Sequence, residues 1–430
     1  TLLNPRLHLG TGILEIVADE TLDLSPSTNV NLSRMYISNS SADKYLSLAT
    51  SSHLPFVPID GVSFNLSLSE LQRVSLIARS ATPGGDGEAL VLDVEFGAVH
   101  DIGIKYNLQQ FGVIIHELPD RIPPIMLSVS INLTTGTLYV MTSETIDTTP
   151  GLNVNSSLIF IGNYSNPSLT GVALSLSSVL AFDSTYVELV LSEEQRVKAI
   201  EMSGQPGGDG NASFVTLRHG AVFDIGLNYN VEATGLRVTE HPDILSPTVI
   251  AVELNYAIGK LVINTSETID ATPNTQVDVN KIKLVNTNVD KPDFILDTVN
   301  IVEKDSLSLT IRLTEAERVA GILRSGTSGG DGVPLVAVVE TGALYDIGVN
   351  PNFAGELNIL EEADTIPPTP IGAEINLTDG RIFLNFSETI RVEDVTQYNM
   401  GQVFLADIAG SKNISLEDAT AMLAISTKLE

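Results

Sequence analysis

Aspartates in two recurring glycine motifs are the residues of this chain best suited to bind a metal ion. Gly-Gly-Asp-Gly occurs at 84–87, 207–210 and 329–332, and Asp-Ile-Gly follows at 101–103, 224–226 and 346–348. In each copy the two aspartates are 15 positions apart (101 − 86, 224 − 209 and 346 − 331). Because Ca²⁺ binds carboxylate and carbonyl oxygens, the motifs offer six possible calcium ligands: Asp86, Asp101, Asp209, Asp224, Asp331 and Asp346.

Two other interpretations compete with calcium, since ligand spacing like that of an EF-hand is absent. Each aspartate can cap a turn through its own backbone, or pair with an arginine that also recurs, at Arg73, Arg196 and Arg318. Acids near the expected module junctions are a second set of possible calcium positions, where we favour a solvated linker instead: Glu117, Asp120, Glu240, Asp243, Glu361 and Asp364.

The glycine loop itself has a phosphate-binding and a turn interpretation. Glycine-rich loops bind phosphate when a Lys-Ser/Thr pair and a helix follow them. Neither signal follows Gly84-Gly85-Asp86-Gly87 or its copies. We therefore predict a turn whose glycines have positive φ.

Catalytic motifs are missing from the sequence. The chain has six histidines, of which only His116 and His241 stand at nearly equivalent places in the repeat. No metal-ligand spacing, nucleophile elbow or Walker loop is present. We expect no enzymatic activity and no cofactor other than possible calcium.

Asparagine glycosylation is the strongest modification signal. Asn-x-Ser/Thr would occur about four or five times by chance in a chain of this composition. Eleven such sites are present, some at repeat-equivalent positions, and they predict N-linked glycans and a location outside a eukaryotic cell: Asn31, Asn39, Asn65, Asn132, Asn155, Asn163, Asn211, Asn264, Asn376, Asn385 and Asn413.

Composition restricts the possible partners. A chain of 430 residues is long enough for about three domains, and 43% hydrophobic residues can fill their cores. The net charge of −30 argues against nucleic-acid and anionic-membrane partners. The sequence contains no run of 18 apolar residues, so it predicts no membrane span. Without cysteine, stability must come from the cores, and the opening Thr1 fits a processed chain or a fragment of a longer one.

The repeats define the expected domains. Glu-Thr recurs at 20–21, 144–145, 267–268 and 388–389, in step with the glycine motifs. We predict modules at residues 1–121, 122–245 and 246–366, and the first half of a fourth module at 367–430. Proline-rich junctions at 119–124, 242–247 and 363–368 predict stiff linkers, because proline fixes φ.

Each module is expected to be an all-β, immunoglobulin-like sandwich of about 120 residues with one short helix. In the second copy, apolar alternation predicts strands at 127–132, 137–142, 157–161, 186–191, 214–217 and 236–240. Capping boxes predict the helix after Ser69, Ser192 and Thr314.

The repeat resembles known surface proteins in three segments of the second copy. These are Ser143-Glu144-Thr145-Ile146-Asp147, Ser192-Glu193-Glu194-Gln195-Arg196-Val197 and residues 220–228, Gly-Ala-Val-Phe-Asp-Ile-Gly-Leu-Asn. They resemble the tandem immunoglobulin-like repeats of mastigoneme-type and sexually induced surface proteins of protists. The last segment is also similar to bacterial immunoglobulin-like repeats of surface-layer proteins and adhesins. The resemblance implies cell-surface fibres.

Two functional hypotheses follow. The first is a glycosylated structural subunit of an extracellular filament or cell-surface fibre that self-associates. The second is the stalk of a cell-surface adhesin whose junctions are stiffened by calcium. Residues 367–430 would leave a half-sandwich with open strand edges. We therefore expect either that the chain continues or that another protomer supplies the missing strands.

Overall fold

The computed structural model describes residues 1–54, 58–164, 171–287, 294–296, 300–390, 398–410, 413–419 and 428–429. The chain separates into two compact units, Thr1–Ile244 and Leu245–Glu430, and each is described by itself. Below, module 1 to module 4 denote the four segments predicted from the repeat.

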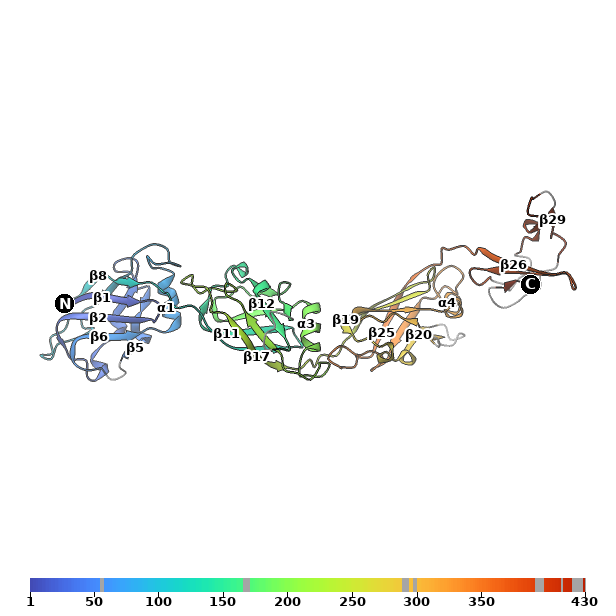
Figure 1. Ribbon diagram of the computed structural model, residues 1–430. Helices are drawn as coiled ribbons and strands as arrows, with labels where there is room; N and C mark the ends of the chain where they lie inside the picture. The colour runs from blue at the N-terminus through green and yellow to red at the C-terminus, as the bar shows by residue number, and fades with distance from the viewer. Residues whose placement is uncertain are drawn as a thin grey trace. The chain divides into compact units, whose positions relative to one another are not determined.

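Module 1 is a sandwich of two sheets (Figure 1). One sheet has the order β5-β6-β2-β1-β9 and the other β4-β3-β7-β8. The strands are β1 (Leu2–His8), β2 (Ile13–Leu22), β3 (Met35–Ser38), β4 (Leu46–Ser47), β5 (Ser52–Leu54), β6 (Gly61–Ser67), β7 (Val91–Val94), β8 (Gln110–Ile114) and β9 (His116–Leu118). Three short 3₁₀ helices, η1 (Ser27–Asn29), η2 (Leu32–Arg34) and η3 (Leu48–Thr50), connect them.

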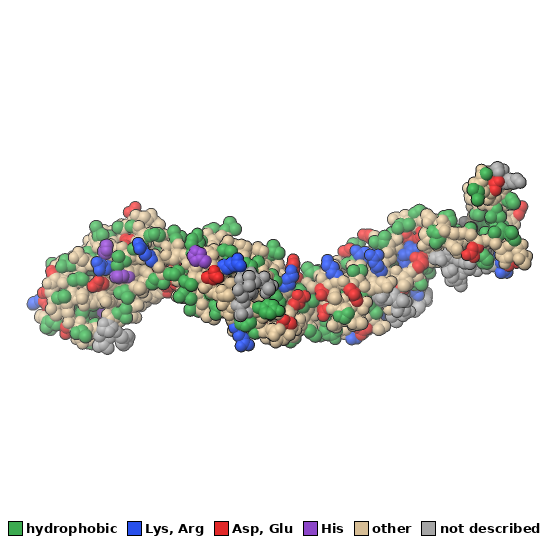
Figure 2. Space-filling view, viewed as in Figure 1, with side chains coloured by type: hydrophobic (Ala, Val, Ile, Leu, Met, Phe, Trp, Pro, Cys, Tyr) green, Lys and Arg blue, Asp and Glu red, His purple; other side chains and the backbone are tan. Residues whose placement is uncertain are grey.

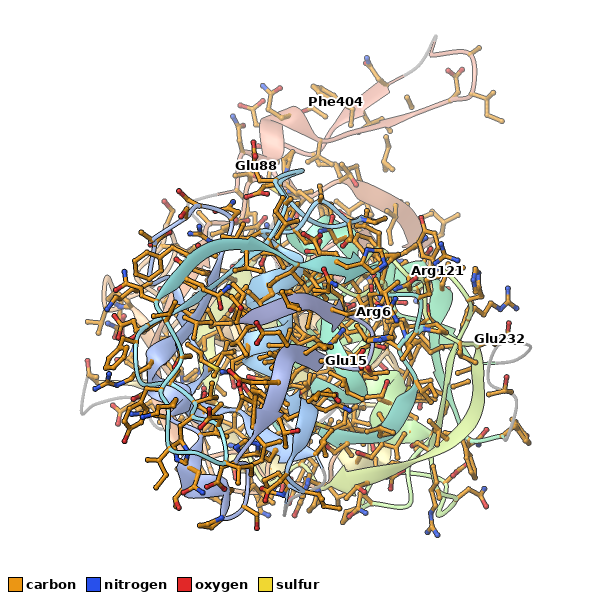
Figure 3. All side chains as sticks on the ribbon, turned by 90° about the vertical axis from the view of Figure 1, so that its left-hand side faces the viewer. Arg6, Glu15, Glu88, Arg121, Glu232 and Phe404 are labelled. Atoms are coloured by element: carbon orange, nitrogen blue, oxygen red, sulfur yellow. The ribbon has the colours of Figure 1, made fainter. Side chains whose placement is uncertain are left out.

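The sheets of module 1 are held in register by alternating side chains. β1 pairs antiparallel with β2, so that Arg6 lies opposite Glu15, as Figure 3 shows on the two neighbouring strands. The inward residues of β2, Leu14 and Ile16, have no exposed surface. They belong to one apolar cluster that spans both sheets.

Module 2 repeats this arrangement with one long strand that serves both sheets. The first half of β17 pairs antiparallel with β16, and its second half pairs parallel with β10. The strands are β10 (Met126–Asn132), β11 (Thr137–Ile146), β12 (Ile159–Gly162), β13 (Val172–Ala173), β14 (Ser178–Val179), β15 (Ser184–Val190), β16 (Phe214–Leu217) and β17 (Ala233–His241), with the 3₁₀ helices η4 (Gly151–Asn153) and η5 (Ser156–Leu158).

The predicted strands of module 2 are all present, with small shifts at their ends. The prediction missed the two-residue strands β13 and β14, which are too short to show a period of two. It also placed residues 157–158 in a strand, where η5 precedes β12.

Module 3 lies in the second unit and has the same strand order as module 2, β21-β20-β24-β25-β18-β19-β23-β22. Its strands are β18 (Val249–Asn255), β19 (Lys260–Ile269), β20 (Ile282–Asn286), β21 (Phe294–Ile295), β22 (Asn300–Ile301), β23 (Ser306–Arg312), β24 (Leu335–Val339) and β25 (Gly355–Glu362), with η6 (Asn274–Gln276) and η7 (Val279–Lys281).

One short helix follows the sixth strand of each sandwich, as predicted. α1 (Glu70–Ile77), α3 (Glu193–Glu201) and α4 (Glu315–Ile322) each begin at a complete capping box, at Ser69, Ser192 and Thr314. In each box the Ser or Thr side chain accepts the N3 amide hydrogen bond and the N3 side chain accepts that of the cap residue. The all-β, immunoglobulin-like fold is confirmed, and among the described residues modules 1 to 3 each have a short helix after a capping box.

Module 4 is represented by β26 (Pro370–Asn376), β27 (Arg381–Phe386), β28 (Phe404–Ala406), β29 (Asn413–Ser415) and β30 (Lys428–Leu429), with η9 (Met400–Gln402). The inward positions of β26 are exposed, and those of β27 are only half-buried. Ile375 is 47% exposed, whereas Ile131, at the same place in module 2, is 1% exposed. The described part of module 4 therefore has no closed core.

Charged side chains are sparse on the molecular surface, since they make up 18% of the chain. Figure 2 shows them scattered among uncharged side chains on the face drawn. None of the helices among the described residues is both long and apolar enough to cross a membrane.

Candidate functional site at the module junction

A buried arginine joins the helix of module 1 to the linker that follows it. Arg73 lies in the second turn of α1, with only 6% of its side chain exposed. One guanidinium nitrogen donates to the carbonyl of Leu9 at 3.2 Å and to the carboxylate of Asp120. The rest of the guanidinium donates to both oxygens of Glu70, at 2.7 and 2.8 Å. Arg73 thus fixes the start of the linker against the end of module 1.

The same arginine also reaches module 2. Its Nη2 donates to Oε2 of Glu144, on β11, at 3.0 Å. Glu70 crosses the junction in the opposite direction, because its Oε1 accepts the backbone N–H of Thr145 at 2.8 Å. The recurring Glu-Thr pair is therefore the part of module 2 that α1 holds, and Figure 1 shows α1 at the end of module 1 that faces module 2.

The two glycine motifs meet across this junction. A Cβ added to Gly84, in the Gly-Gly-Asp-Gly loop of module 1, would lie 1.8 Å from the carbonyl oxygen of Ile225. A Cβ on Gly226 would lie 2.8 Å from the Cβ of Asp120. Ile225 itself packs against the apolar cluster of module 1. The loop is a turn, as predicted, and glycine is required at position 84 because another backbone touches it there.

Three carboxyl groups converge beneath this contact. Asp120, Glu144 and Asp224 are 4%, 6% and 0% exposed. Each offers one oxygen that lies within 4.8 Å of those of the other two. Burial raises the pKa of Glu144 to about 8, against the opposing charge of Arg73, with help from Asp224 and Asp120. Burial also raises the pKa of Asp224 above its ordinary value.

Glu70 behaves differently from its neighbours. Burial opposes ionisation there too, but the hydrogen bonds from Arg73 and Thr145 outweigh it and lower the pKa of Glu70. Similarly, burial opposes the charged form of Arg73, yet Glu70, Glu144 and Asp120 raise the pKa of the guanidinium. The pair Arg73–Glu70 is therefore ionised at neutral pH, whereas the raised pKa of Glu144, about 8, favours its protonated form there.

The same polar arrangement recurs in the second unit between module 3 and module 4. Arg318 donates to Asp364 and, at 2.9 Å, to Oε2 of Glu388. Glu315 accepts the N–H of Thr389 at 2.7 Å. A cavity of about 240 Å³ lies beside these groups, lined in part by Glu315, Arg318 and Glu388.

The backbone contact that Gly84 makes with Ile225 has no counterpart among the described residues of this second arrangement. A Cβ on Gly329, the counterpart of Gly84, would meet only the side chain of Ile322 at 3.3 Å. Ile322 is partly exposed, whereas its counterpart Ile77 is fully buried in module 1. Within the described residues of this unit, nothing takes the place that Ile225 has beside Gly84.

The expectation of a solvated linker at the junction acids was wrong, because none of the six is exposed and each accepts a hydrogen bond. Asp120 and Asp243 are each 4% exposed and pair with Arg73 and Arg196. Glu117 is half-buried and accepts the N–H groups of Ala81 and Leu90. These acids tie the linker to the module before it, because their oxygens accept hydrogen bonds from backbone N–H groups and from the guanidinium of that module. Glu240 and Glu361 do the same as Glu117, and Asp364 pairs with Arg318.

The aspartates of the Gly-Gly-Asp-Gly loops make turn contacts. Oδ1 of Asp86, Asp209 and Asp331 accepts the N–H two residues on, at 2.9 to 3.0 Å. Their Oδ2 atoms accept from the amides of Asn39, Asn163 and Asn286. Asp101, Asp224 and Asp346 each cap the turn that follows, by accepting an N–H four residues on. Among the described residues of the first unit, Asp224 is the one of these six that lies close to junction acids.

Several glycosylation candidates have structural contacts as well. The amides of Asn39 and Asn163 hold Asp86 and Asp209, and Asn286 does the same in module 3 although no Ser or Thr follows at the acceptor position. Asn31, Asn132 and Asn376 accept backbone hydrogen bonds in turns, and Asn155 bonds to the Ser157 hydroxyl. Asn31, Asn155, Asn211, Asn376 and Asn413 are exposed, and Asn39, Asn65, Asn132, Asn163, Asn264 and Asn385 are half-buried.

Sequence reasoning missed the roles of Glu70 and Glu144 in the junction. Both lay in recurring patterns, but the partner of each is about 70 residues away or more, at separations of 71 for Arg73–Glu144 and 75 for Thr145–Glu70. The recurring arginine and the recurring Glu-Thr pair repeat along the chain at the same interval. That shared interval is the signal that could have indicated their contact.

Comparison with known proteins identifies no family. No family model matches the chain, and no curated protein does. Among solved structures, the N-terminal part of the bacterial S-layer protein SbsC aligns with 40% of this chain and 38% of its own, at 12% identity and a TM-score of 0.20. Chicken CNTN1 domains FN1–FN3 align with 84% of this chain and 97% of their own, at 8% identity and a TM-score of 0.24. Drosophila OTK extracellular domains 3–5 give the same coverage and identity, with a TM-score of 0.20.

Proposed function

We propose that this chain is a structural subunit of an extracellular, N-glycosylated filament or cell-surface fibre. The observation that carries the proposal is the filled junction between modules 1 and 2. Arg73 binds the linker and module 2 at once, and Gly84 lies in backbone contact with Ile225. Such a joint resists bending, because bending would expose buried charges and break close packing.

The repetition of this joint supports the same role. Arg318, Glu315, Asp364 and Glu388 form the same set of hydrogen bonds in the second unit. Because the same polar joint is present at two junctions of the chain, we infer that its role is to set how one module is oriented relative to the next. In a fibre, that geometry sets how each module follows the last.

We propose that self-association involves module 4. Ile371, Ile375 and Leu377 on and after β26 are 69%, 47% and 85% exposed. Apolar strands with open edges take up further strands readily. A strand from another protomer, added by β-augmentation, would cover these side chains.

The glycans and the location belong to the same proposal. Five of the candidate asparagines are exposed, so their side chains are open to a transferase. Glycans at Asn65, Asn264 and Asn385 would stand on strands β6, β19 and β27.

The test is to secrete the chain from eukaryotic cells, map its glycopeptides and image it over a range of concentrations. The fibre account predicts occupied Asn-x-Ser/Thr sites and assemblies that grow with concentration. A matched variant, Ile375→Asp, should stay glycosylated and lose assembly. Dispersed, unmodified single chains at every concentration would contradict the proposal.

A second candidate is the stalk of a cell-surface adhesin. It is favoured by the buried carboxyl cluster at the junction, which is what a cation-stiffened stalk requires. The same imaging separates the two, because a stalk remains a single extended chain where a fibre subunit assembles.

A further inference from the structure

Modules 1 and 2 each contain two Asn-x-Ser/Thr sites at repeat-equivalent places. Asn31 corresponds to Asn155, and Asn39 corresponds to Asn163 (155 − 31 = 124 and 163 − 39 = 124). The amide nitrogen Nδ2 is the atom to which an N-linked sugar is attached, and its two hydrogens can also donate hydrogen bonds within the protein. The role of each Nδ2 in the fold therefore separates asparagines that are open to a sugar from asparagines that are not.

The amide nitrogens of Asn39 and Asn163 donate hydrogen bonds within the fold. Nδ2 of Asn39 donates to Oδ2 of Asp86 at 2.7 Å, and Nδ2 of Asn163 donates to Oδ2 of Asp209. Both asparagines are half-buried. Each aspartate is the acid of a Gly-Gly-Asp-Gly loop, and its Oδ1 accepts the N–H two residues on. The two asparagines therefore hold these loops in place.

Module 3 keeps this hydrogen bond without keeping the glycosylation site. Asn286 stands where Asn163 does (286 − 163 = 123) and is 5% exposed. Its Nδ2 donates to Oδ2 of Asp331 at 3.0 Å and to the carbonyl of Arg324 at 2.5 Å. Residues 287–288 are Thr-Asn, so neither Ser nor Thr stands at the acceptor position. The asparagine at this place thus supplies amide hydrogens, which an ionised aspartate could not provide.

Asn31 and Asn155 use the oxygen of the amide instead. Oδ1 of Asn31 accepts from the N–H and the hydroxyl of Ser33, at 3.2 and 2.6 Å, and Oδ1 of Asn155 accepts from the Ser157 hydroxyl at 2.6 Å. Module 3 has Asp278 at this place, whose Oδ1 accepts the N–H two residues on at 3.2 Å. An aspartate serves there because only an oxygen is needed. Both asparagines are exposed, and neither Nδ2 donates to any group among the described residues.

We propose that Asn31 and Asn155 carry N-linked glycans, whereas Asn39 and Asn163 stay unmodified as structural amides. In the transfer, Nδ2 attacks C1 of an oligosaccharide that is linked to a lipid diphosphate. The Nδ2–C1 bond forms, the C1–O bond breaks, the diphosphate leaves with the electron pair, and Nδ2 gives one proton to a base of the transferase. At Asn31 and Asn155 that proton is one that no described group of the fold uses. At Asn39 and Asn163 the sugar would stand beside the aspartate of the loop, in a half-buried place.

This assignment rests on the proposed N-glycosylation of the chain and gives it a pattern. Asp86, which Asn39 holds, lies two residues from Gly84, and Gly84 lies in backbone contact with Ile225 of module 2. A sugar on Asn39 would displace the loop that makes this contact. The pattern therefore keeps sugar off the loop of module 1 that forms the joint.

Asparagine-to-aspartate changes in the full chain, made without glycans in bacteria, test the structural half of the proposal. Asn39→Asp loses the hydrogen bond and puts a second carboxylate beside the loop aspartate, so the unfolding equilibrium constant should rise about tenfold. Asn31→Asp is the matched control, because module 3 has Asp278 at that place, and it should change the constant by no more than about twofold. Urea denaturation measures both, and equal effects would refute the structural role. Asn163→Asp with its control Asn155→Asp repeats the comparison in module 2 if Asn39→Asp does not fold.

Site mapping of the folded chain, secreted from eukaryotic cells, tests the other half. Enzymatic removal of the sugars in heavy-oxygen water converts each glycosylated asparagine into labelled aspartate, and a digest without the enzyme controls for spontaneous deamidation. We expect label at Asn31 and Asn155 and none at Asn39 and Asn163. Label at Asn39 or Asn163, or label elsewhere with none at Asn31 and Asn155, would overturn this assignment alone. No label at any of the eleven sites would overturn it together with the glycosylated part of the proposed function.

Discussion

Gly84 of module 1 and Ile225 of module 2 touch through their backbones, so closely that a methyl group on Gly84 would lie 1.8 Å from the Ile225 carbonyl oxygen. The two residues belong to the two glycine motifs that recur along the chain, and the contact explains why the motifs recur together. In space, the Gly-Gly-Asp-Gly loop of module 1 lies at the junction, and the Asp-Ile-Gly turn of module 2 meets it there.

Substitution of Gly84 by alanine should loosen this joint. The change adds a clash with the backbone of module 2 to the cost of a side chain at φ +86°. Overpacking of this kind costs about 1–3 kcal/mol. Gly329→Ala is the matched control, because its φ is +93° and it meets only Ile322. Its cost should be the strain of the left-handed backbone alone, about 1–2 kcal/mol.

Urea denaturation of both glycine variants measures the difference. The account requires Gly84→Ala to lose more stability than Gly329→Ala in the transition of the module that carries each change. Equal losses would show that the contact with Ile225 contributes nothing.

Removal of the arginine at the centre of the joint should be severe. Arg73→Met leaves Glu70, Asp120 and Glu144 without their counter-charge, and such a loss in a buried network costs about 3–5 kcal/mol. Arg121→Met, at an exposed arginine of the same linker, should change stability by no more than about 0.5 kcal/mol. Differential scanning calorimetry of the two variants checks this, and similar melting profiles would contradict it.

The pH dependence of stability should report on Glu144. Its pKa is about 8 in the folded chain against 4.5 ordinarily, so the folded state binds the extra proton between those values. This contribution is fully present below pH 4.5 and is lost as the pH rises through 8. In chelator, stability should therefore fall between pH 5 and about 8, and Glu144→Gln should fall less.

Denaturant titrations at several pH values, without divalent cations, provide this measurement. Glu20→Gln serves as the control and should keep the wild-type slope, since Glu20 is exposed. A slope unchanged in Glu144→Gln would remove Glu144 as the titrating group.

The features of this joint that could be predicted are those whose residues lie close together in the sequence. The capping boxes at Ser69, Ser192 and Thr314 span three residues, so the sequence predicts them directly. The strands follow from alternation within a few residues, and β13 and β14 escape because two residues show no alternation. The pairing of Arg73 with Glu144 joins residues 71 apart in different modules. Spacing along the chain shows that both recur, but not that they meet.

Burial was the other quantity that the sequence did not show. Asp120 lies among Pro, Asp and Arg in a segment of linker composition, which predicts exposure. It is buried because the linker folds back on the end of module 1, where Arg73 and the N–H of Ile122 bind it.

The core of module 3 offers a separate test of packing. Tyr256 is fully buried there, with its hydroxyl donating to Glu361 at 2.6 Å, and Gly321 lies beside its ring. A Cβ on Gly321 would be 3.0 Å from the Tyr256 ring. At the same places module 2 has Leu133 and Ala199, both fully buried.

Gly321→Ala should therefore destabilise module 3 by about 1–3 kcal/mol through overpacking. The double variant Tyr256→Leu, Gly321→Ala recreates the pair of module 2 and should recover part of that loss. Guanidinium denaturation of the single and double variants measures the coupling between the two sites. Additive effects would show that the ring and the added methyl group do not compete for space.

The most direct measurement of the joint is the distance distribution between spin labels in modules 1 and 2. The chain has no cysteine, so Ser63→Cys and Glu232→Cys, both at exposed positions, can be labelled selectively. A fixed junction predicts one narrow distribution by double electron–electron resonance, which broadens when Gly84→Ala or Arg73→Met is added. A broad distribution in the otherwise unchanged chain would contradict the account.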